Sequence, residues 1–217
     1  MIPQFVENQD ETYAGHDGAA RVAALADAAD PSAWYGRSRA RVALAILLAA
    51  SGIPSLFMGQ EALESRLWSD DPSNPNTLIN WQALSTDPAR RDFLRFATDA
   101  IAQRRRLPAL RGPRIRVSRA NSFERVLVVH RWLEGQAADV VLVASLDERA
   151  KLGYRIGLPQ SGPWRECLNS DVYDGFPNPN PVGNDGSVNA EPIPWDGFTA
   201  SAALNIPANG ALLLARG

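Results

Sequence analysis

The most constraining feature of this sequence is an apolar stretch, Val42–Ala50, that is followed after Gly52 by a second apolar run, Ile53–Met58. A helix that is apolar on every side has to be covered on every side. A short apolar run without alternation is typical of a strand in a parallel sheet that is buried on both faces. The two stretches therefore predict a helix over residues 32–51 and then a buried strand.

Two further signals repeat this alternation of strand and helix in the first half. A short strand is expected over Ile2–Glu7, and Asp87-Pro88 predicts a helix start, because Asp caps helices and Pro fits the first turn. Arg104–Arg106 would end that helix, where cations complement the helix dipole, so we interpret this run as a helix end rather than as a binding site. Residues 1–110 are therefore predicted to be an α/β segment.

The second half changes to short runs rich in Val, Ile and Leu. Strands are expected over residues 114–118, 126–130, 140–145, 154–158, 203–206 and 211–214. Asn209-Gly210 between the last two is a hairpin signal, and residues 169–197 are predicted to be mostly loop. The pattern therefore predicts an antiparallel β-sandwich domain over residues 111–217.

Composition excludes several classes of function. The chain has 217 residues, a formal net charge of -2, one cysteine and two histidines. It has no broad basic surface for nucleic acid and no cysteine or histidine cluster for a metal, and we expect neither a metal nor a cofactor. No signal peptide or membrane-spanning stretch is expected, so a cytoplasmic protein that binds neither nucleic acid nor membrane is predicted.

Polar clusters follow both predicted strands, at Asn8–Glu11 and at Gly59–Glu61, with Trp68 further along. Catalytic and binding residues lie at the carboxyl ends of parallel strands in this kind of sheet. An aromatic ring beside carboxylates is suited to binding a sugar. The alternatives are a solvated loop, a surface charge at Glu61 and a covering role for Trp68. The pattern alone leaves these alternatives open.

Two motifs resemble the α-amylase family of glycoside hydrolases. Residues 5–10 (Phe-Val-Glu-Asn-Gln-Asp) are similar to the motif that ends the seventh barrel strand, and residues 52–61 are similar to the eighth-strand motif. Other matches resemble the 1,4-α-glucan branching enzymes most closely. They are Ala20-Arg21-Val22, Leu63-Glu64, Ile79-Asn80-Trp81, Val129-His130-Arg131-Trp132 and Asn169-Ser170-Asp171.

The resemblance implies the last two strand–helix units of a (β/α)8 barrel followed by a β-sandwich. It also implies a retaining mechanism with a nucleophile, an acid and a third carboxylate. Only the third carboxylate, which stabilises the transition state, has a counterpart in this sequence, and that counterpart is Asp10. Gln9 replaces the family's sugar-binding histidine, and Glu61 and Trp68 are the other predicted substrate-binding residues.

The leading hypothesis is a piece of an α-glucan-processing enzyme, most like a branching enzyme, that is inactive alone. Its partners would be an α-1,4-glucan (glycogen, starch or maltooligosaccharide) and a chain that carries the missing barrel strands. The alternative is a noncatalytic glucan-binding or barrel-completing module, with Trp132, Trp164 or Trp195 as sugar platforms. Burial of these rings would contradict the platform hypothesis.

Overall fold

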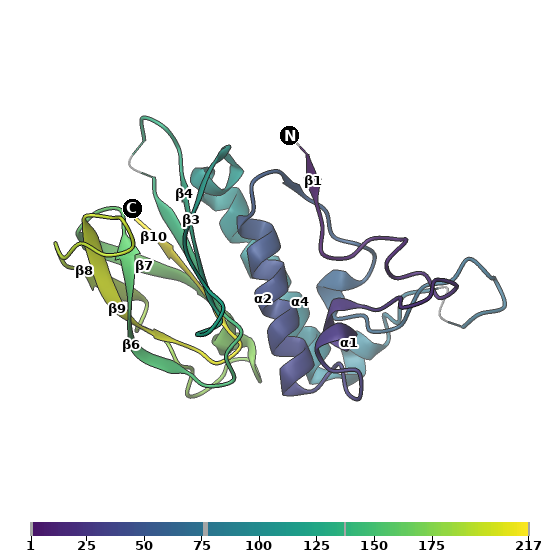
Figure 1. Ribbon diagram of the computed structural model, residues 1–217. Coiled ribbons are helices and arrows are strands. Elements are labelled where there is room, and N and C mark those ends of the chain that lie inside the picture. Colours follow the sequence, from purple (N-terminus) through teal and green to yellow (C-terminus); the bar gives the residue numbers. More distant parts are fainter. Residues whose placement is uncertain (1, 76–77, 137, 217) are drawn as a thin grey trace.

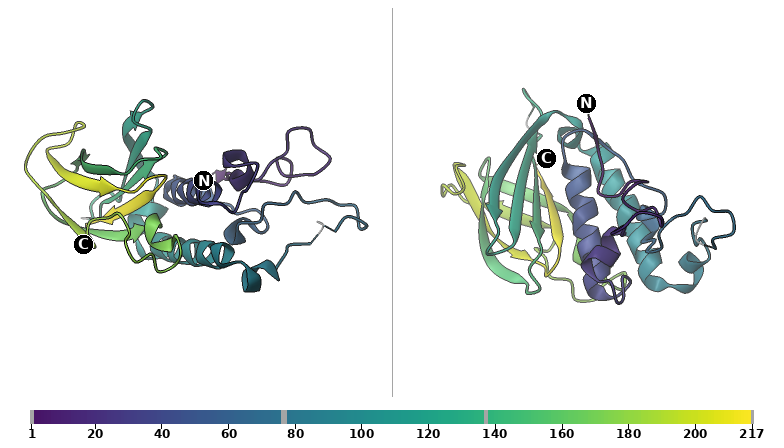
Figure 2. Two further views of the ribbon diagram at one scale, coloured as in Figure 1. Left: turned by 90° about the horizontal axis from the view of Figure 1, so that it is seen from below. Right: turned by 45° about the vertical axis from the view of Figure 1, so that its right-hand side comes forward.

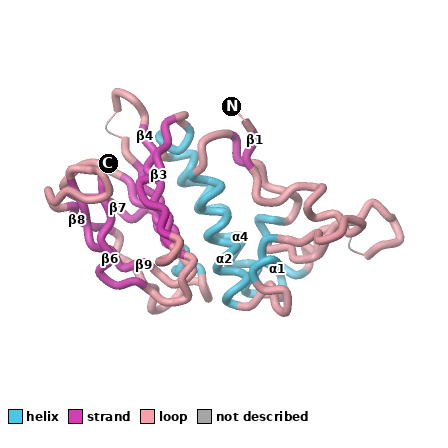
Figure 3. Tube along the Cα trace, in the orientation of Figure 1, coloured by secondary structure: helices cyan, strands magenta, loops and turns pink. Residues whose placement is uncertain are grey.

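The computed structural model describes residues 2–75, 78–136 and 138–216. Helices lie at the centre of the molecule, a β-sandwich lies on one side, and long loops extend on the other side (Figures 1 and 3). The chain therefore runs from loops and helices into strands, in the order that the sequence predicts.

The two predicted strands of the first half are much shorter than expected. β1 (Pro3–Gln4) and β2 (Ile53–Pro54) form a parallel pair in which Pro3 lies opposite Ile53. The parallel pairing is confirmed, but the predicted lengths of Ile2–Glu7 and Ile53–Met58 were wrong. A strand is regular only where its backbone groups pair with a neighbour, and these two have only each other among the described residues.

The predicted helices are confirmed to within about two residues. They are α2 (Trp34–Ala49) and α4 (Pro88–Arg106). A short helix precedes each of them, α1 (Val22–Ala26) before α2 and α3 (Ala83–Thr86) before α4. The Asp87 carboxylate accepts a 2.9 Å hydrogen bond from the backbone N–H of Ala89, as an N-cap should.

The sandwich has one large sheet and one small sheet. The large sheet has the order β3-β4-β5-β10-β7-β8, and β6 pairs with β9. The bounds are β3 Arg114–Asn121, β4 Val126–Trp132, β5 Val140–Ser145, β6 Lys151–Leu158, β7 Gly162–Asn169, β8 Ser187–Ala190, β9 Ala200–Ile206 and β10 Ala211–Ala215. All pairs within it are antiparallel, which confirms the predicted class.

One local prediction in the sandwich was wrong, and one strand was missed. Asn209-Gly210 does not close a hairpin, because β9 and β10 belong to different sheets and the turn carries the chain between them. The backbone N–H of Asn209 bonds instead to the Asp147 carbonyl at 2.7 Å. β7 was missed, because Gly162, Pro163 and Asn169 dilute its alternation. The four-residue β8 lies within residues 169–197, which are otherwise mostly loop as predicted.

The helices and the sandwich share one hydrophobic core. Buried Leu44 of α2 and Phe96 of α4 belong to the same cluster as Leu142 of β5 and Leu213 of β10. A second cluster lies between the two sheets and includes fully buried Trp164. The sandwich therefore covers one side of α2, which the sequence pattern could not assign.

Two buried arginines bind backbone carbonyls at the end of α2, and one of them, Arg131, joins the sandwich to the helices. Arg104 of α4 donates to the carbonyls of Ala50 at 3.2 Å and Gly52 at 2.7 Å, and Arg131 of β4 donates to the Ala49 carbonyl. These carbonyls lie at the negative end of the helix dipole. Burial lowers the pKa of Arg131 to about 10. Arg104 lies in the last turn of α4 as predicted, but it binds the end of α2 rather than facing solvent.

Candidate functional site

The chain that follows β1 and the chain that follows β2 enclose a hollow of about 360 Å³. Because the two strands are parallel, the segments after them leave the pair at the same edge. The lining residues are Phe5, Glu7, Asn8, Gln9, Asp10, Ser55, Leu56 and Phe57. The structure therefore brings Gln9 and Asp10 together in one concave surface, where their functional roles stay predictions.

The Asn8 side chain fixes the backbone conformation at Asp10. Its side-chain oxygen accepts hydrogen bonds from the backbone N–H groups of Asp10 and Glu11, both at 2.9 Å. This local turn is typical of Asn, whose short side chain can bond to the backbone two and three residues on. The Asp10 side chain is exposed, so it is accessible to a ligand in the hollow.

Trp68 supports this turn from the neighbouring loop and lies outside the hollow. Its indole Nε1 donates to the Gln9 carbonyl at 2.6 Å, and its ring packs at 5.0 Å from the Tyr13 ring. Backbone hydrogen bonds join the same two loops, from Ala14 N–H to the Trp68 carbonyl at 2.9 Å and from Trp68 N–H to the Thr12 carbonyl at 3.1 Å. Both loops extend away from the helices (Figure 2).

Glu61 also lies outside the hollow. It is half-buried in the short 3-10 helix Gln60–Ala62, behind the segment that follows β2. It lies close enough to Glu7 for its charge to contribute to the raised pKa of that carboxyl. Glu61 therefore lies near the hollow without lining it, and its role in substrate binding stays a prediction.

A buried ion pair that was not among the predicted site residues supports the hollow. Arg21 donates to Glu7 at 2.9 Å, with both side chains almost fully buried. Arg21 also donates to the carbonyls of Arg66 at 3.0 Å and Met58 at 3.1 Å, so it links three segments. Burial raises the pKa of Glu7, although the Val22 N–H and Arg21 favour its ionised form. The available signal was that both partners lie in segments that resemble the α-amylase family, residues 5–10 and Ala20-Arg21-Val22.

A second buried carboxylate, Glu64, holds the loop that leads to Trp68. It accepts hydrogen bonds from the Arg66 guanidinium at 3.0 Å and from the backbone N–H of Asn80 at 3.0 Å. Burial opposes its ionisation, but these hydrogen bonds outweigh burial and lower the pKa of Glu64 to about 2. Glu64 thus remains ionised at neutral pH and organises the loop as a fixed anion.

Two searches of the described residues, 2–75, 78–136 and 138–216, gave negative results. No three His, Cys, Asp or Glu side chains gather closely enough there to hold a metal ion. No helix in those ranges is both long enough and apolar enough to cross a membrane.

Residues 117–217 match the family described as alpha amylase, C-terminal all-beta domain. The chain is 32% identical over 182 residues to the 1,4-alpha-glucan branching enzyme GlgB of Cereibacter sphaeroides, covering 80% of this chain and 24% of that protein. It is 33% identical over 190 residues to GlgB of Burkholderia thailandensis, covering 84% and 22%. The chain therefore spans about a quarter of the length of the curated relatives it matches.

Solved structures resemble this fold over the whole chain. An alpha-amylase from Geobacillus thermoleovorans, complexed with acarbose, matches with a TM-score of 0.63 at 20% identity, covering 100% of this chain and 39% of that one. A debranching enzyme from Nostoc punctiforme matches with a TM-score of 0.62 at 15% identity, covering 99% and 35%. These likenesses concern the fold, and the sequence relatives confirm the resemblance that the motifs predict.

Proposed function

We propose that this chain, which belongs to the α-amylase family, supplies one wall of an α-glucan-processing active site within a larger catalytic unit. The observation that carries the proposal is the hollow at the end of the β1–β2 pair, lined by Gln9 and Asp10. In a parallel barrel this edge is where substrates bind.

The proposed reaction is branching. A carboxylate nucleophile would attack the anomeric carbon and break the α-1,4 bond while an acid protonates the leaving 4-oxygen, which leaves a glycosyl chain bound to the nucleophile. A sugar 6-hydroxyl would then displace the nucleophile at that carbon and give its proton back to the acid/base residue. Asp10 would bind sugar hydroxyls as positive charge develops, and Gln9 would donate and accept hydrogen bonds beside it. The nucleophile and the acid have no matching motif in this sequence, so we propose that the isolated chain is inactive.

Exposed apolar side chains around the β1–β2 pair support the proposal of a larger unit. Ile2 is 73% exposed, Phe5 52% and Ile53 52%, at an edge where further parallel strands would cover them. We propose that residues 1–110 are the last two strand–helix units of a (β/α)8 barrel. Residues 111–217 would be the C-terminal sandwich domain of the same cytoplasmic enzyme.

Reconstitution tests this proposal. The chain would be co-expressed with a branching-enzyme segment that carries the preceding barrel strands, and branch points formed in amylose would be counted. Asp10→Asn should abolish activity without preventing co-purification, whereas the matched change Asp17→Asn, at an exposed position further along the same loop, should not. Robust turnover of amylose or glycogen by the isolated chain would refute the proposal.

A second candidate function is noncatalytic glucan binding by the sandwich. Burial contradicts this role for Trp164, and Trp132 is half-buried and stacked on His130 at 4.7 Å. Trp195 is 42% exposed and is therefore the most accessible of the three. Calorimetric titration with maltoheptaose, repeated with Trp195→Ala, tests it. The absence of measurable affinity, or equal affinity in both proteins, would contradict it.

A further inference from the structure

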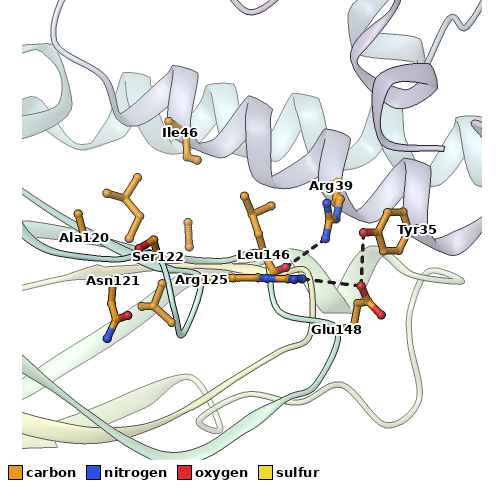
Figure 4. Close-up of a pocket in the computed structure, with 12 residues that line it drawn as sticks. Tyr35, Arg39, Ile46, Ala120, Asn121, Ser122, Arg125, Leu146 and Glu148 are labelled. Atoms are coloured by element: carbon orange, nitrogen blue, oxygen red, sulfur yellow. Dashed lines mark hydrogen bonds and ion pairs between the residues drawn. The ribbon is translucent and has the colours of Figure 1, made fainter. Parts of the chain in front are cut away.

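A cavity of about 630 Å³ lies between α2 and the sandwich, away from the β1–β2 hollow. Tyr35, Arg39 and Ile46 project into it from the helix, and Ala120, Ser122 and Arg125 come from the facing β3–β4 hairpin (Figure 4). Its volume is within the range of pockets that bind small organic ligands, about 300 to 1,000 Å³. We refer to it as the junction pocket.

The junction pocket has an apolar floor. Ile46 of α2, Leu127 of β4 and Ala144 of β5 line it, and Ala144 is almost fully buried. An apolar floor favours a ligand that has a compact hydrophobic body. These three residues lie on a helix and on two strands rather than on loops.

Cations outnumber anions among the described residues that line the pocket. Arg39 and Arg125 carry positive charge, and Glu148 carries the negative charge. Arg39 is held in place: its Nε donates to Asn209 at 3.1 Å, its Nη2 donates to the Leu146 carbonyl at 3.2 Å, and its guanidinium lies 4.1 Å from the Tyr35 ring centre. Its Nη1 has no hydrogen-bond partner among the residues that the structure describes, so it can bind another acceptor.

Arg125 is available to a ligand as well. It contacts Glu148 at 3.8 Å, and both side chains are more than half exposed, so their attraction is weak. The Tyr35 hydroxyl donates to the same carboxylate at 3.4 Å, which gives Glu148 a second partner when Arg125 moves to a ligand. An anion at the mouth would therefore gain Arg125 at little cost.

The geometry points to the junction pocket as a binding site for a small amphipathic anion: a compact apolar body with one sulfonate, carboxylate or phosphate group. The apolar body would lie on the floor formed by Ile46, Leu127 and Ala144, and the anionic group would lie between Arg39 and Arg125. Such a ligand would contact α2 and the sandwich together, and so would bind only while the two are docked.

A fluorescence titration of the full chain with anilinonaphthalene sulfonate tests this inference. Ala120→Trp, which places an indole in the pocket, should weaken binding at least about tenfold. Ala203→Trp is the matched control, because Ala203 is an exposed alanine on β9 outside the pocket, and it should leave the titration unchanged. Ser122→Trp should repeat the loss if the first variant does not fold.

Two further arms separate charge from simple hydrophobic adsorption. Arg125→Glu should weaken binding by about fivefold or more, and neutral N-phenylnaphthylamine should bind at least about tenfold more weakly than the sulfonate. Ile2→Ser removes an exposed apolar side chain beside β1 and should change nothing. Equal affinity for the neutral dye, unchanged binding in Ala120→Trp, or loss of binding in Ile2→Ser would overturn the inference.

Discussion

Glu64 offers a sharp test of how the loop beside the candidate site is held. Its buried carboxylate accepts hydrogen bonds from the backbone N–H groups of Ser65 and Arg66, both at 3.1 Å, and from that of Asn80 at 3.0 Å. The Arg66 guanidinium donates two more, at 3.0 Å each. Glu64→Gln keeps the shape of the side chain but removes the charge that these donors stabilise.

The magnitude follows from the pKa. The pKa of Glu64 falls from its ordinary 4.5 to about 2 in the folded protein. At about 1.4 kcal/mol per pKa unit, the ionised carboxylate stabilises the fold by about 3 kcal/mol. Since the pKa is lower in the folded state, this stabilisation is complete above about pH 4.5. It is lost as the pH falls from there towards 2.

Urea unfolding followed by circular dichroism, from pH 7 to pH 2.5, measures this effect. Glu64→Gln should lower the free energy of unfolding by about 3 kcal/mol at pH 7, and the difference from wild type should shrink as the pH falls below 4.5. Glu11→Gln, a change at an exposed position, is the control and should have little effect. A difference below about 1 kcal/mol at pH 7, or one that does not change down to pH 2.5, would refute the reasoning.

Three further predictions concern the core between the two sheets, the contact of Arg131 with the end of α2, and the single cysteine. Trp164→Ala should lower the free energy of unfolding by about 3 to 5 kcal/mol in urea titrations, because the ring is fully buried between the sheets. Arg131→Met should speed amide hydrogen exchange at residues 48–52, since it removes the bond to the Ala49 carbonyl, while exchange within β7 should stay unchanged. Burial raises the pKa of the Cys167 thiol, so iodoacetamide should react with it more slowly than with free cysteine at pH 8, and an equal rate would contradict this.

Local sequence signals predicted the helices and the class of each half. The apolar stretch within α2 and the Asp87-Pro88 start of α4 act over neighbouring residues, so a pattern reports them directly. The motifs after β1 and β2 also predicted which residues line the hollow, for Gln9 and Asp10. For Trp68 the pattern left a substrate-binding and a covering role open, because a sequence does not say whether an indole faces a ligand or supports a neighbouring loop.

The tertiary structure alone decided how the parts are joined. The Glu7–Arg21 pair, the meeting of Arg104 and Arg131 at the end of α2, and the passage of Asn209-Gly210 between sheets all depend on contacts between distant segments. The junction pocket depends on the docking of α2 against the sandwich. The sequence by itself determined the family, the helices and the antiparallel class, because these depend on local spacing. The burial of charged side chains and the shape of cavities depend on which surfaces come into contact, and those contacts exist only in the folded chain.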